Sequence, residues 1–140
     1  MIRRFLIFLL MLTVVFVLCA AQTKIQTKPA PLTPAESGKE MYKAYCASCH
    51  GLDGKGTGPA ATAMKAPLPD LTQLSKKNGG KFPGYHVAAI IQGDSNSPSH
   101  GSADMPVWGP VFLRMSQQHT AEVQQRVHNL SDYIESLQVK

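Results

Sequence analysis

The chain has 140 residues, the usual length of one domain, and 44% of them are hydrophobic. It carries 14 basic and 9 acidic residues, but two of the basic ones lie within the first four positions, ahead of an apolar run. Without these two, 12 basic residues face 9 acidic ones and the net charge is only +3, so we expect no nucleic-acid partner.

Residues 1–21 are typical of a secretory signal. Two arginines precede an apolar run over 5–17, and the small residues of a cleavage site follow at 19–21. We expect cleavage before Gln22. The rest of the chain would then be exported, to the periplasm or to the outer face of the cytoplasmic membrane.

Two alternatives remain open for this end of the chain. Cys19 is a candidate for lipidation, and the apolar run is just long enough to be retained as an uncleaved anchor. Either would attach the exported protein to the membrane. Residues 22–32 contain two prolines among polar residues and predict an extended tether, so that the domain occupies 33–140.

A helix is predicted from Pro34 to about Ala47. Thr33 can cap its first turn, Pro34 suits the first helical position, and Glu36 completes a capping box. The residues expected on its buried side are Met41, Ala44 and Tyr45.

The segment Cys46-Ala47-Ser48-Cys49-His50 has the C-x-x-C-H spacing that attaches a c-type haem covalently. Each thiol adds to one vinyl group of the porphyrin, and the following histidine is placed under the iron as an axial ligand. Half of a zinc site or a redox dithiol would also explain two such cysteines. However, the other histidines form no pair at zinc-finger spacing, and a dithiol motif should follow a strand rather than a helical segment. We therefore favour haem.

Four glycines fall within the nine residues of Gly51–Pro59, which favours a tight loop packed against a flat ligand. Short helices and loops are expected next. The pattern predicts a turn at 67–71 that opens a short helix through Leu74, a second glycine-rich loop at 78–84, and a helix from Gly84 or Tyr85 to Gln92 that Gly93 ends.

A polar loop over 94–104 leads to Met105, which Pro106 holds in an irregular segment where its sulfur is available for binding. The last helix is predicted from Ala121 to Gln138, with Thr120 as its cap. Its apolar stripe consists of Val123, Val127, Leu130, Ile134 and Leu137. Since no segment shows strand-like alternation, the expected fold class is all-α.

These features together resemble a class I c-type cytochrome over residues 34–138. The resemblance rests on the C-x-x-C-H site, the loop ending in Gly58-Pro59, the segment Met105-Pro106-Val107-Trp108-Gly109 and the terminal helix ending at 133–138. It implies a small all-α domain wrapped around one haem c, bound covalently through Cys46 and Cys49.

The resemblance also implies roles for residues around the haem. His50 and Met105 would bind the iron from opposite faces, and the carbonyl of Pro59 would accept a hydrogen bond from the His50 imidazole N–H. Trp108 would support a haem propionate or line a docking edge, although a lone tryptophan beside a ligand loop is also explained as a core residue.

Two further points follow from the same resemblance. Gly38 would let the first and last helices approach closely, with Tyr42 and Tyr133 packed at their crossing. As sixth ligand of the iron, Met115 and His100 remain alternatives to Met105.

The expected function is electron transfer, because iron bound on both faces has no open position for a substrate. The protein would then be an electron carrier and not an enzyme. Its partners would be a redox donor and a redox acceptor, with membrane oxidases and dehydrogenases among the candidates. The alternatives are a haem subunit of a dehydrogenase or terminal oxidase complex, and a haem protein that binds a gas or a small oxidant.

Overall fold

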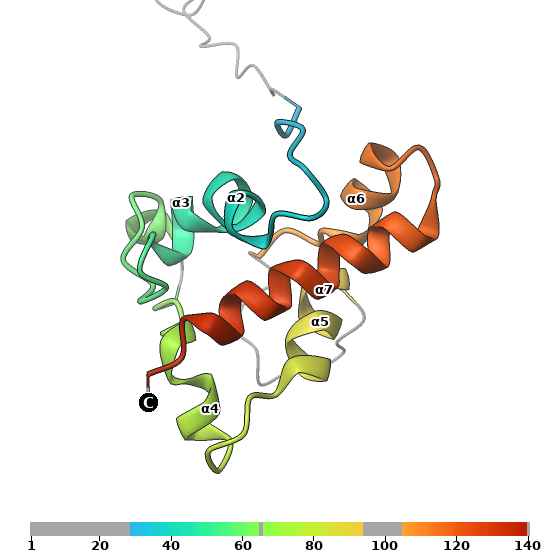
Figure 1. Ribbon diagram of the computed structural model, residues 1–140. Coiled ribbons are helices and arrows are strands. Elements are labelled where there is room, and N and C mark those ends of the chain that lie inside the picture. The colour runs from blue at the N-terminus through green and yellow to red at the C-terminus, as the bar shows by residue number, and fades with distance from the viewer. Residues whose placement is uncertain (1–28, 65, 94–104, 140) are drawn as a thin grey trace, which may run out of the picture.

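The computed structural model describes residues 29–64, 66–93 and 105–139. The predictions for the signal, for Cys19 and for His100 lie outside these ranges. Within them the chain is helical and contains no strand, as the sequence indicates (Figure 1). None of the helices in these ranges has the length and apolar character needed to cross a bilayer.

The first helical stretch consists of α2 (Gly38–Met41), a π-helical turn η1 (Tyr42–Cys46) and α3 (Ala47–His50). It begins at Gly38 and not at Pro34, because Ser37 is its cap and accepts a hydrogen bond from the Glu40 N–H at 3.3 Å. The predicted start was therefore four residues too early.

Thr33 cannot cap this helix because both of its oxygens are occupied elsewhere. Its hydroxyl lies 2.7 Å from the hydroxyl of Tyr45, and its carbonyl accepts a hydrogen bond from Arg126 at 2.8 Å. The wider π turn also changes which residues face inward. Met41 and Tyr45 are buried as predicted, whereas Ala44 is exposed.

Short elements connect the first stretch to the rest of the core. They are η2 (Ala61–Ala63), η3 (Leu71–Gln73), α4 (Leu74–Lys77), α5 (Gly84–Gln92) and α6 (Gly109–Met115). The end of α5 at Gly93 is confirmed, since this glycine has a φ of 88° and adopts the left-handed conformation. Helix α6 was not predicted from the sequence.

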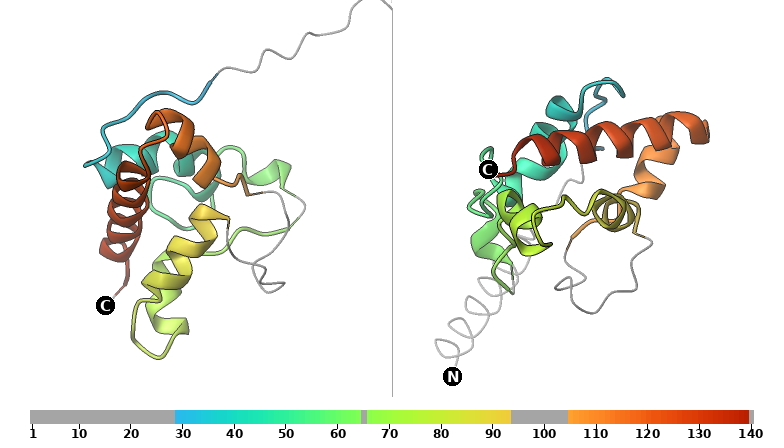
Figure 2. Two further views of the ribbon diagram at one scale, coloured as in Figure 1. Left: turned by 90° about the vertical axis from the view of Figure 1, so that its right-hand side faces the viewer. Right: turned by 60° about the horizontal axis from the view of Figure 1, so that its bottom comes forward.

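The last helix, α7 (Thr120–Ser136), spans the molecule from α6 at one end to the segment around α4 at the other (Figures 1 and 2). Its N-cap position is His119, not Thr120. The predicted apolar stripe faces the core, where Val123, Val127, Leu130 and Ile134 are all buried. These residues pack against α2 and α5 and form the centre of the fold.

The crossing of α2 and α7 has the predicted form. A Cβ atom on Gly38 would overlap the backbone carbonyl of Asn129 and lie 3.0 Å from the Cβ of Tyr133, so only glycine permits this approach. The rings of Tyr42 and Tyr133 pack beside it with centroids 5.2 Å apart.

Candidate haem site

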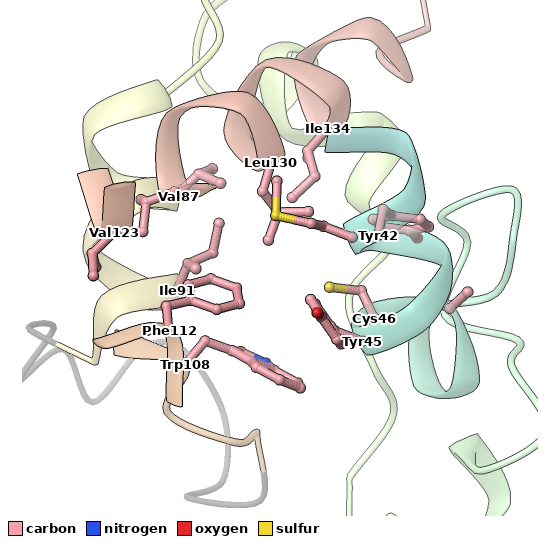
Figure 3. Packing of buried hydrophobic residues seen from close by; sticks show 13 residues of the cluster. Tyr42, Tyr45, Cys46, Val87, Ile91, Trp108, Phe112, Val123, Leu130 and Ile134 are labelled. Carbon is pink, nitrogen blue, oxygen red and sulfur yellow. The ribbon is translucent and has the colours of Figure 1, made fainter. Parts of the chain in front are cut away.

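The two cysteines lie at the far end of the first helical stretch, as predicted. Cys46 ends η1 and is 7% exposed, whereas Cys49 is partly exposed and belongs to α3. Both are free thiols. The Cys46 side chain points into the apolar cluster formed by the surrounding helices (Figure 3).

The glycine-rich loop 51–59 caps the C-terminal end of α3. Helix ends leave backbone carbonyls without partners, and here all four carbonyls of α3 accept a hydrogen bond. The pairs are Gly51 N to Ala47 O at 2.9 Å, Ala60 N to Ser48 O at 2.8 Å, Gly58 N to Cys49 O at 3.0 Å, and Gly56 N to His50 O at 2.8 Å. The backbone that carries Cys49 and His50 is thus fixed from its C-terminal side.

The glycine at position 58 is required by this contact. A Cβ on Gly58 would lie 2.6 Å from the carbonyl oxygen of Ala47 and 2.7 Å from that of Cys49. The sequence led us to expect a loop packed against a flat ligand. At position 58 the loop packs against the helix backbone, and so positions the cysteine and histidine.

His50 is buried, and its Nδ1 has no hydrogen-bond partner among the described residues. The hydrogen bond expected with the carbonyl of Pro59 is not formed, and Pro59 itself is exposed. Burial lowers the pKa of His50. The backbone of Pro69 has a smaller effect in the opposite direction. Burial therefore favours the neutral form of the imidazole, which is the form that binds metals.

An aromatic group from two segments lies beside the thiol of Cys46 (Figure 3). The ring of Tyr45 is 4.8 Å from that of Trp108 and 5.8 Å from that of Phe112, and the Trp108 and Phe112 rings are 5.7 Å apart. With Val87 and Ile91 from α5 they form an apolar region that excludes water. Trp108 is buried, as the core interpretation of this residue requires.

Backbone contacts hold the methionine segment against α5. The Trp108 N–H donates to the carbonyl of Ile91 at 3.0 Å, and a Cβ on Gly109 would lie 2.6 Å from the carbonyl oxygen of Gln92. Met105, three residues earlier, is half-buried and packs against the core cluster. The structure therefore brings Met105 and Trp108 to the same core as Cys46.

Two other methionine sulfurs each lie near a polar group. The Tyr45 hydroxyl approaches the Met115 sulfur at 3.7 Å, and the Met41 sulfur lies 3.9 Å from Nη1 of Arg126. Met41 is fully buried. Arg126 was not singled out from the sequence, and the contacts of Tyr45 were not predicted, because the partners of both residues are distant in the chain.

The competing explanations of the cysteine pair find no support in this geometry. Among the described residues, no three His, Cys, Asp or Glu side chains are grouped so that they could bind a metal such as zinc. Burial, with a smaller effect of Cys49, raises the pKa of the Cys46 thiol to about 12, whereas the reactive cysteines of redox dithiols have a lowered pKa.

Free thiols three positions apart, a buried imidazole with an unpaired nitrogen and an adjoining apolar core define a helical protein that binds haem covalently. The family model for cytochrome c matches residues 35–138. The chain belongs to the cytochrome c family, whose members carry haem c and generally transfer electrons. Neither the curated proteins nor the solved structures gave a significant match to this chain.

Proposed function

We propose that this protein is a class I electron carrier with a single haem c, and that it is not an enzyme. The observation that carries the proposal is the buried imidazole of His50, held at the end of α3 with an unpaired Nδ1 beside the free thiols. When bound, haem c supplies a one-electron Fe(II)/Fe(III) couple.

In this proposal each residue of the site has a distinct task. Cys46 and Cys49 hold the group through thioether bonds, and His50 provides a nitrogen ligand. The hydrogen bonds between the glycine-rich loop and α3 fix the direction of these side chains. Tyr45 and Trp108 keep water away from the site, which limits solvent reorganisation during electron transfer.

Met105 is proposed as the second axial ligand. It packs against the core cluster that contains Cys46, as Met115 also does, and the resemblance of the segment 105–109 to the methionine loop of the family favours Met105. Thioether sulfur favours the ferrous form and raises the reduction potential relative to a second imidazole. With both axial positions filled, no coordination site is open to a substrate.

Substitution of the two methionines tests this assignment. In the oxidised protein, Met105→Ala should abolish the absorption band of thioether bound to ferric iron, and Met115→Ala should leave it intact. The opposite pattern would assign the sulfur ligand to Met115. Rapid binding of carbon monoxide by the reduced wild-type protein at neutral pH would contradict the electron-carrier proposal and favour a gas-binding role.

We further propose that the domain is exported and exchanges electrons with a redox donor and a redox acceptor at or near the membrane. The support is the signal-like N-terminal sequence together with the exposed carboxylates and lysines of the domain surface. Mass spectrometry of the mature N-terminus, after cell fractionation, tests the export. An unprocessed cytosolic product would contradict it.

A further inference from the structure

A groove of about 310 Å3 lies between α5 and α7, which cross in contact with each other (Figures 1 and 2). It is separate from the site described above, because none of the residues proposed for haem binding lines it, namely Cys46, Cys49, His50, Pro59, Met105 and Trp108. One wall comes from α5 and the residues before it, and the other comes from α7. A partner bound in the groove would leave those six residues uncovered.

The α5 wall presents aromatic and apolar surface. Phe82, Tyr85 and Ala88 belong to it, and Tyr85 is 92% exposed, the highest value among the large hydrophobic residues of the described chain. Val87 and Ile91 of the same helix point into the core. Tyr85 therefore contributes nothing to the core, and its ring face is available to a ligand.

The α7 wall presents carboxylates. Asp132 and Glu135 are both exposed, and His128, one turn before Asp132 on the same helix, has its Nε2 3.4 Å from the Asp132 carboxylate. The Glu135 side chain makes no hydrogen bond or ion pair with any described residue. No lysine or arginine lines the groove, and Lys81, which precedes Phe82, lies outside it.

An aromatic ring on one wall of a groove and two carboxylates on the other suit an organic cation, because the ring face and the carboxylates both attract positive charge. We propose that this groove docks a basic segment of a partner protein, with a lysine or arginine side chain placed between the Tyr85 ring and the carboxylates of Asp132 and Glu135. The surface would hold the partner in place independently of the haem edge.

The test uses the reduced, 15N-labelled holoprotein and a tetra-arginine peptide as the probe. At low ionic strength we expect chemical-shift changes confined to 82–92 and 124–135, which fade as salt is added. A tetra-glutamate peptide should produce no such changes. Shifts spread over the whole surface, or centred elsewhere, would overturn the proposal.

Variants make the test specific to the groove. The double substitution Asp132→Asn and Glu135→Gln should weaken peptide binding about fivefold, and Tyr85→Ala should weaken it about threefold. Glu36→Gln removes an exposed carboxylate that does not line the groove and should leave the affinity unchanged. Because all these side chains are exposed, folding should be unaffected.

Two outcomes of the variant series would overturn the proposal. One is equal peptide affinity for the double variant and for Glu36→Gln. The other is self-association that the double variant abolishes, without peptide binding by the wild-type protein. In that second case the groove would be an interface between copies of this chain.

Discussion

Gly38 of α2 and Asn129 of α7 meet so closely that a single methyl group on the glycine would overlap the asparagine carbonyl. Nearby, the Asn129 side-chain amide donates to the carbonyl of Ala35 at 2.9 Å. The first and last helices are thus joined by backbone proximity as well as by side chains. This contact positions the helical stretch that carries both cysteines.

We predict that Gly38→Ala destabilises the holoprotein by about 3 kcal/mol or more, because neither backbone can move without breaking neighbouring contacts. The free energy of unfolding, measured with denaturant, tests this. Gly84→Ala is the matched control, since a Cβ at this position would make ordinary contacts with Phe82 carbons at 3.5–3.6 Å and the Ser131 hydroxyl at 3.9 Å. Equal stability of the two variants would show that α2 and α7 do not cross at Gly38.

Gly58→Ala should destabilise the protein by about 2 kcal/mol, because the added methyl group would force the loop away from α3 and break its hydrogen bonds. Gly79→Ala serves as a comparison. Gly79 has a φ of 67° and no atom within 4 Å of an added Cβ, so its substitution costs only backbone strain of about 1 kcal/mol. A smaller effect at Gly58 than at Gly79 would contradict the capping of α3.

Gln138 connects the C-terminal end to the segment before α4. Its amide nitrogen donates to the carbonyls of Leu71 at 2.7 Å and Ile134 at 2.9 Å, and its amide oxygen accepts from the Ser75 N–H at 2.8 Å. We predict that Gln138→Ala lowers the free energy of unfolding by about 2 kcal/mol. Val139→Ala, which keeps its backbone hydrogen bond with Thr72, should change it little.

The ion pair between Glu122 and Arg126 should make stability depend on pH in the acid range. The hydrogen bond from Arg126, and then that with Ser116, holds the pKa of Glu122 below its ordinary value of 4.5. The stabilisation is therefore complete above 4.5 and is lost as the pH falls through the lower pKa of the folded state. Glu122→Gln should remove this dependence, and identical acid profiles of variant and wild type would argue against it.

The elements that were predicted correctly are those whose signals are local. The end of α5 follows from Gly93, whose left-handed conformation stops a helix, and the buried face of α7 follows from its apolar spacing. The start of α2 was predicted wrongly, because Ser37 caps it while the hydroxyl of Thr33 contacts Tyr45 and its carbonyl accepts a hydrogen bond from Arg126. Local capping preferences could not reveal those partners.

Some residues of the candidate site could likewise be predicted from the sequence, and others could not. Cys46, Cys49 and His50 are contiguous, and their chemistry requires that spacing, so the motif alone points to them. The aromatic group beside them joins Tyr45 to Trp108 and Phe112 across more than 60 positions, and only the packing of α6 shows it. Helix α6 is itself short and carries no periodic pattern long enough to predict it.

The most direct test of the account is the intact mass of the exported protein after denaturation and acid extraction. We predict the mass of the polypeptide plus one haem, and loss of that added mass when both Cys46 and Cys49 are replaced by serine. A protein that carries no porphyrin after extraction, although its maturation is complete, would contradict the assigned cofactor and with it the proposed electron transfer.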